Sequence, residues 1–254
     1  MRYLTRGYVF AACAFVLTTL LYVLLQRFPE WLHYLSNIVE PAFSLIPLVM
    51  AAFSLRAHRH DRWFGRVDIF LSVGFLFWFL GEFTWSFYAL YLGIEIPFPS
   101  LADVFWLVAY PFVLIGMVAF VAPFKEAVNR RNILPASVVS VLATVLIVVG
   151  LVLPVLSFSN DMFGNVVSLA YPMLDTALLF AAVMGVMVFW GGRIARGWYW
   201  LTAGAVLMSL ADILFSYFVA NGTYYEGHPL DLFFEFSYAC FGLAIYEHLG
   251  ALVE

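Results

Sequence analysis

Long apolar stretches fill almost the whole chain and decide what it can fold into. A stretch of about 20 apolar residues crosses the hydrocarbon core of a bilayer as a helix. Irregular backbone facing lipid would leave its amide groups without hydrogen-bond partners. The sequence therefore predicts an all-α polytopic membrane protein. We expect eight transmembrane helices, at about residues 7–27, 37–56, 67–93, 101–122, 133–157, 163–190, 198–220 and 229–249.

The composition agrees with this class, because 65% of the 254 residues are hydrophobic and only 11% are charged. We expect a single membrane domain over residues 1–254, with no separate soluble domain. The first 27 residues have a basic start, a long apolar body and no cleavage site, which indicates an uncleaved signal anchor. The expected partner is the lipid bilayer, and no nucleic acid is expected.

Basic residues lie on alternate connections between the stretches. They precede the first stretch and follow the second, fourth and sixth, whereas only Arg27 lies on the opposite side. Cytoplasmic loops carry the excess of lysine and arginine. We therefore expect a multi-pass protein of the plasma membrane with both termini in the cytoplasm. The residues concerned are Arg2, Arg6, Arg56, Arg59, Arg62, Arg66, Lys125, Arg130, Arg131, Arg193 and Arg196.

The third and fourth stretches resemble the seventh and eighth in the order of their residues. The pairs that align at one spacing are Leu71 and Leu201, Gly74 and Gly204, Glu82 and Asp212, Ser86 and Ser216, and Pro99 and Pro229. After a two-residue contraction, Asp103 aligns with Asp231 and Tyr110 with Tyr238; Pro41 and Pro172 give a weaker match. We expect two parallel four-helix repeats, residues 1–128 and 129–254, related by an axis near the membrane normal. The alternative is that two apolar segments match by composition alone.

Acidic residues inside the stretches are the best indication of function. An unpaired charge in hydrocarbon costs roughly 2.5 kcal/mol or more, so each acid needs a partner, a cavity or a proton. We expect an acidic cavity with an aromatic lining that opens to the outer side. Trp85 shares a helical face with Glu82, and Tyr217 is expected near Asp212. The candidate ligand-binding residues are Glu82, Asp212, Asp175, Asp103, Asp231, Glu235, Trp85, Tyr110 and Tyr238.

Carboxylates beside aromatic faces can hold an organic cation, bind a metal ion or carry protons. Spacing alone does not choose among these, so the cofactor and any metal stay open. Asp103 and Asp231 have a second interpretation, as acids that cap helices next to Ser100 and Pro229. Glu82, Asp175 and Asp212 lie deeper in their stretches, where a functional role is favoured.

Enzyme motifs are weak in this sequence. It has no glycine-rich phosphate loop, no GxSxG nucleophile motif and no kinase motif, and its histidines form no close zinc pattern. His58 lies in a basic loop and His248 at the cytoplasmic end of the last stretch. His228, next to Asp231, leaves a hydrolytic metal site as a minor alternative. These observations do not favour an enzyme, and no catalytic residue is expected.

The segment PFPSLADVFW at residues 97–106, followed by Ala109-Tyr110-Pro111, resembles a segment of membrane-embedded input regions. Such regions precede the output domains of prokaryotic sensor histidine kinases and diguanylate cyclases. The resemblance covers about residues 67–121 and, more faintly, the second half. The sequence given ends at Glu254 without a signalling helix or output domain. The resemblance therefore implies a stand-alone sensory module whose output lies on a separate signalling protein.

Three functions follow from these observations. The first is a sensory or ligand-binding module that takes a small ligand or cation from the outer side. The second is a proton- or cation-coupled small-molecule transporter, because parallel halves and acids near the membrane midplane suit alternating access. The third is a structural subunit of a larger membrane complex, whose acids pair with the basic residues of a membrane partner protein.

Overall fold

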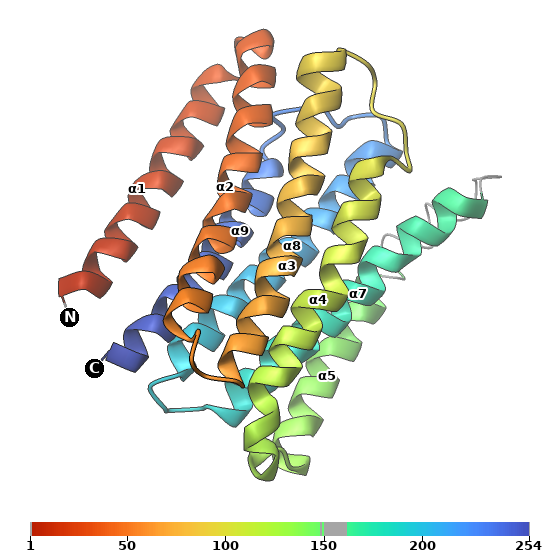
Figure 1. Ribbon diagram of the computed structural model, residues 1–254. Coiled ribbons are helices and arrows are strands. Elements are labelled where there is room, and N and C mark those ends of the chain that lie inside the picture. Colours follow the sequence, from red (N-terminus) through yellow and green to blue (C-terminus); the bar gives the residue numbers. More distant parts are fainter. Residues whose placement is uncertain (1, 148, 150–161, 254) are drawn as a thin grey trace.

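The computed structural model describes residues 2–147, 149 and 162–253, which form helices and, within those ranges, no strand. Figure 1 shows them as a bundle of long helices. These are α1 (Arg2–Leu25), α2 (Pro29–Ala57), α3 (Phe64–Ser86), α4 (Leu101–Val121), α5 (Arg130–Ile147), α7 (Met162–Val188), α8 (Ala195–Ala220) and α9 (Asp231–Val253). A short π-helix, η1 (Phe87–Leu92), extends α3, and a 3-10 helix, η2 (Ala122–Ala127), extends α4.

Six helical segments are long and apolar enough to cross a membrane. They are Gly7–Leu25, Pro29–Ala57, Phe64–Leu92, Leu101–Ala127, Met162–Val188 and Ala195–Ala220. The prediction of a helical membrane protein is confirmed at this level. In α5 only Ile133–Leu142 is strongly apolar, and α9 carries three acids, so a total of eight spans stays a prediction.

One predicted boundary is clearly wrong. The second helix begins at Pro29 and not near residue 37, because proline and Glu30 both suit the first turn of a helix. Hydropathy finds the apolar body of a helix but not its polar first turns. The predicted end of the fifth stretch, residues 150–157, lies outside the described residues.

Six of the helices pack into a closed ring. Around the ring α2 packs on α3, α3 on α4, α4 on α7, α7 on α8, α8 on α9, and α9 again on α2. Outside the ring α1 lies along α9, and α5 lies along α7 (Figure 1). The connections α2–α3, α4–α5 and α7–α8, which carry most of the basic residues, lie at one end of the bundle; we call it the basic end.

Two aligned glycines make equivalent close contacts inside the ring. A Cβ atom on Gly74 of α3 would lie 2.5 Å from Cγ2 of Val113 on α4. A Cβ atom on Gly204 of α8 would lie 2.7 Å from Cδ1 of Phe241 on α9. Val113 and Phe241 are related by the contracted spacing of the two halves. In both places a carbonyl oxygen of the facing helix is also near, at 3.2 and 3.1 Å. These contacts support the proposed duplication.

Adding a methyl group at either glycine is expected to destabilise the protein. Gly74→Ala and Gly204→Ala must each push the facing helix away, and overpacking of this kind costs about 1–3 kcal/mol. Thermal unfolding of the purified protein in detergent measures the loss. Ala52→Leu, at an exposed position of α2, is the control and should melt like the parent. Two glycine variants as stable as the parent would contradict the close packing.

Candidate functional site

The hydroxyl group of Tyr110 lies between two carboxyl groups. It donates to Oδ1 of Asp175 at 2.7 Å and lies 3.1 Å from Oδ2 of Asp212. An ionised carboxylate only accepts hydrogen bonds, and a tyrosine hydroxyl has one proton to donate. Both contacts are full hydrogen bonds only when one of the two carboxyl groups is protonated and donates to the tyrosine oxygen.

A second tyrosine makes the corresponding contact from the other half of the chain. Tyr238 of α9 donates its hydroxyl proton to Oε1 of Glu82 on α3 at 2.6 Å, and both side chains are buried. Tyr110 of α4, in turn, reaches Asp212 on α8. Because Tyr110 aligns with Tyr238 and Glu82 with Asp212, each half supplies the tyrosine for the acid of the other half.

Asp103 combines two roles. Its Oδ2 accepts hydrogen bonds from the backbone N–H of Ser100 at 2.7 Å and from the Ser100 hydroxyl at 2.9 Å, which completes a capping box at the start of α4. Its Oδ1 accepts from the hydroxyl of Tyr171 on α7 at 2.9 Å. Asp103 therefore caps α4 and also accepts a hydrogen bond from a tyrosine of α7.

Asp231 and Glu235 lie on successive turns at the start of α9. Oδ2 of Asp231 accepts from the backbone N–H of Gly227 at 2.9 Å, and Oε1 of Glu235 accepts from the hydroxyl of Tyr22 on α1 at 2.6 Å. The second oxygen of Glu235 is buried without a hydrogen-bond partner, and the side chain of Tyr224 lies beside Asp231. Glu40 of α2 is buried within electrostatic reach of both acids and of Glu82. The contacts of Tyr22 with Glu235 and of Tyr171 with Asp103 were not predicted from the sequence.

We call this set of acids and tyrosines the carboxyl network. Its members are Glu40, Glu82, Asp103, Asp175, Asp212, Asp231 and Glu235, with Tyr22, Tyr110, Tyr171 and Tyr238. Residues 29–55, 67–121, 162–188 and 197–253, which supply nearly all of the ring, contain no lysine or arginine. Within the described residues, no group of three or more His, Cys, Asp and Glu side chains is arranged to hold a metal ion. An ionised carboxyl group in these segments needs a proton or a cation to compensate its charge.

Of the two aromatic residues expected beside the acids, Trp85 shares a face of α3 with Glu82, and Tyr217 lies elsewhere. Trp85 is half-buried and packs on Trp106 and Phe215, with ring centroids 5.7 and 5.9 Å away. Tyr217 is 48% exposed and packs on Phe218. Tyr217 follows Asp212 by five residues in α8, and this spacing places the two side chains on different faces of the helix. The expectation that Tyr217 lies beside Asp212 is therefore wrong.

The connection that precedes α9 forms a cap at the end opposite the basic end. Glu226 pairs with Nδ1 of His33 and accepts from the Asn37 amide at 2.6 Å. Nδ1 of His228 accepts from the backbone N–H of Leu230 at 3.2 Å, and partial burial lowers the pKa of this imidazole. One ring nitrogen of His228 is thus occupied by the backbone, which does not favour it as a metal ligand.

An aromatic layer lies between the carboxyl network and the basic end. Trp78, one helical turn nearer the basic end than Glu82, is 2% exposed. Its ring stacks on Phe241 at 5.4 Å and meets Tyr110 edge-on at 5.4 Å. This layer separates the carboxyl network from a small cavity at the basic end.

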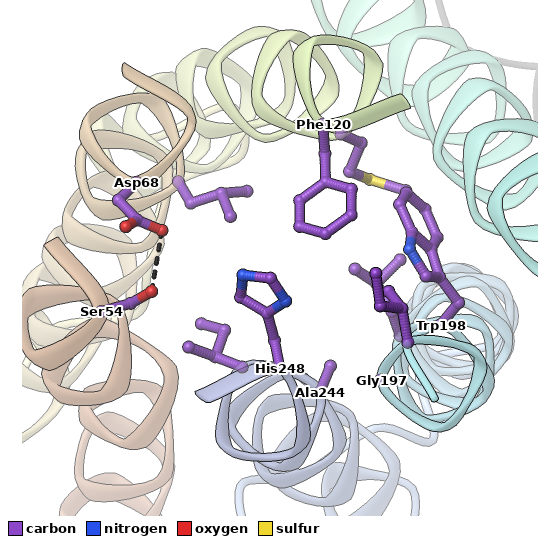
Figure 2. Close-up of a pocket in the computed structure, with 12 residues that line it drawn as sticks. Ser54, Asp68, Phe120, Gly197, Trp198, Ala244 and His248 are labelled. Carbon is purple, nitrogen blue, oxygen red and sulfur yellow. Dashed lines mark hydrogen bonds between the residues drawn. The ribbon is translucent and has the colours of Figure 1, made fainter. Parts of the chain in front are cut away.

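That cavity has a volume of about 50 Å³ and is lined by α2, α3, α4, α8 and α9 (Figure 2). Ser54 and Asp68 line one side, Phe120 and Trp198 the other, and His248 projects between them. No sequence pattern predicted a site at this position.

Comparisons of the chain with protein-family models, with curated proteins and with solved structures found no match. Function is therefore inferred from the chemistry of the carboxyl network.

Proposed function

We propose that this protein is a membrane sensory or ligand-binding module that takes protons, or a small cation, into the carboxyl network from the outer side. The observation that carries the proposal is the contact of Tyr110 with both Asp175 and Asp212, in which one hydroxyl proton serves two carboxyl groups and a second proton would complete the hydrogen bonds. Removing that proton would leave a buried negative charge in segments that have no basic residue. Such a charge attracts a replacement proton or a cation.

The exchange of tyrosines between the halves gives a route for relaying the event. Each bridge joins two helices of different halves, so a change in protonation also changes the contact between the halves. A ligand shifts a conformational equilibrium only by its different affinity for the two states. Hydrogen bonds such as that of Tyr238 with Glu82, formed in one state and broken in another, would supply this difference.

The sensory role also draws on the likeness of residues 97–111 to input regions of prokaryotic sensor proteins. Under this proposal the basic end faces the cytoplasm, as do both termini, and an output protein binds there. The aligned glycines and tyrosines support two parallel repeats, residues 1–128 and 129–254, as the framework of the module.

A coupled transporter is the second candidate. One observation favours it: polar groups lie at both ends of the ring, with the aromatic layer around Trp78 between them. Transporters that alternate access keep such a barrier on one side of a central site at a time. Substrate accumulation driven by a pH gradient in proteoliposomes would support this function over a receptor.

The proposed function predicts that stability depends on pH through Asp212 and Glu82. The melting temperature of the purified protein would be measured over a pH series and with a panel of amines and metal ions. If the shared proton stabilises the fold, the parent melts at lower temperature as the pH rises. Asp212→Asn and Glu82→Gln keep a neutral side chain, so they should weaken this pH dependence and any stabilisation by a cation.

Glu30→Gln, at an exposed position of α2, is the matched control and should behave like the parent. A parent whose melting does not respond to pH or to any cation, with both variants equally stable, would overturn the proposal. Co-purification of one stoichiometric membrane partner would then favour a structural subunit.

A further inference from the structure

A histidine and an aspartate at the basic end form a buried dyad. Nδ1 of His58 lies 2.6 Å from Oδ2 of Asp68, and the Ser54 hydroxyl donates to Oδ1 of Asp68 at 2.9 Å. The side chains of His58 and Asp68 are only 9% and 6% exposed. Because a carboxylate only accepts, we assign the hydrogen of the neutral imidazole to Nδ1. Nε2 of His58 then carries a free lone pair.

A second imidazole faces this dyad. The rings of His58 and His248 have centroids 5.5 Å apart. Nε2 of His58 and Nδ1 of His248 are both buried and have no hydrogen-bond partner. His248 projects into the cavity of about 50 Å³ (Figure 2). The walls of this cavity are mostly apolar, but its volume has room for water, and the two unpaired imidazole nitrogens are polar partners that a water molecule needs.

The other half of the chain fills the equivalent place with apolar residues. At the spacings that align the halves, the pairs are Ser54 with Gly185, His58 with Phe189, Asp68 with Trp198, and His248 with Phe120. Phe189 stacks on Trp198 with centroids 5.7 Å apart, and the Cα of Gly185 faces that indole. An aromatic cluster is therefore sufficient to pack this part of the fold. The polar residues of the first half have a role beyond packing.

We propose that Asp68, His58 and His248 form a second proton site, at the basic end, in which the two imidazoles share one proton through water in the cavity. Asp68 supplies one negative charge, so one proton makes the site neutral. A second proton would leave a buried positive charge, which is costly. The site therefore holds a single proton between two histidines.

The surrounding helices add no competing charge to the cavity. To its lining α2 contributes Ser54, with His58 beside it, and α3 contributes Asp68 and a leucine. The residues from α4 and α8 are apolar or glycine. On α9 the nearby Glu247 accepts a hydrogen bond from Tyr8 of α1. The exposed Asp61, which follows α2, lies within electrostatic reach of His58 and Asp68 and adds one acid outside the cavity. Protonation of this site is thus set mainly by Asp68 and the two imidazoles.

Histidine titration in the full chain tests the proposal. The protein, labelled with ¹⁵N-histidine and purified in detergent, would be followed by NMR over a pH series. In the parent, His58 and His248 should respond to each other's protonation, as interacting groups do. His248→Phe places the residue of the aligned position at this site and should turn the response of His58 into a simple single-site titration with a different midpoint. An unchanged His58 titration in this variant would overturn the proposal.

A second variant keeps the test valid if His248→Phe does not fold. Asp68→Asn removes the negative charge with little change of shape, and the proton affinity of the pair should fall about tenfold or more. Equal proton affinity in Asp68→Asn and the parent would also overturn the proposal. His60→Asn, at an exposed position, is the control. Glu82→Gln and Asp212→Asn should leave the His58 and His248 titrations unchanged, so this site and the proposed function fail or succeed separately.

Discussion

Trp78→Ala is expected to lower the free energy of unfolding by about 3–5 kcal/mol, the usual cost of emptying a buried tryptophan site. Trp78 is 2% exposed and stacks on Phe241 with the two rings 10° from parallel. Tyr238 also lies beside it, with centroids 6.1 Å apart. Chemical or thermal unfolding of the purified protein in detergent measures the loss.

Trp190→Ala is the matched control for this prediction. Trp190 has the same side chain but is 70% exposed, so its removal should change stability by much less. Equal losses in the two variants would contradict the assignment of Trp78 to the packed core. A second readout follows from its position, since opening the aromatic layer should let proteoliposomes that contain Trp78→Ala dissipate a pH gradient faster than those that contain the parent.

Tyr110→Phe should cost about 1–3 kcal/mol, because it leaves buried carboxyl oxygens of Asp175 and Asp212 without their donor. Tyr238→Phe removes a donor from Glu82 alone and should cost less. Tyr217→Phe is the control, since Tyr217 is 48% exposed. Thermal unfolding at low and at neutral pH measures all three, and the loss in Tyr110→Phe should be larger where the carboxyl groups are ionised.

A double-mutant cycle sharpens this second prediction. Tyr110→Phe and Asp212→Asn would be made singly and together, and the difference from additivity gives the coupling energy of the pair. Residues in one hydrogen-bond network couple by about 0.5–3 kcal/mol. Additive effects would mean that Tyr110 and Asp212 do not share a proton as proposed.

Much of the fold was predictable because hydropathy indicates which segments of the chain lie in lipid. Apolar runs long enough to span a bilayer become helices, since no other backbone satisfies its amides in lipid. The first turns of α2 were missed because Pro29 and Glu30 act through helix-end chemistry and not through hydropathy. The ring order was also not predictable, because helix neighbours depend on which faces pack and not on the span pattern.

For the candidate site, the aligned residues were the useful signal. Glu82, Asp212, Tyr110 and Tyr238 were selected because they recur, and the structure brings each tyrosine to the acid of the other half. This exchange was not predicted, because recurrence identifies equivalent residues but not their contacts. Tyr22 was missed because nothing repeats it.

The site at the basic end was missed for the opposite reason. His58 and His248 do not recur, and a search for recurrence discards them. What marks them is that the aligned positions of the other half differ in polarity: Phe189 aligns with His58, and Phe120 aligns with His248. In a chain with two similar halves, the positions that differ in polarity deserve the same scrutiny as those that agree.

The exchange of tyrosines also bears on how such a chain can arise. In an interface with two-fold symmetry, a residue of one subunit contacts a second residue of its partner, and the partner returns the same contact. Tyr110 with Asp212, and Tyr238 with Glu82, stand in this relation within one polypeptide. The proposed repeats therefore have the geometry of a homodimer whose subunits were joined end to end. Under the proposed duplication the two copies differ at the basic end, where only the first holds Asp68 and His58.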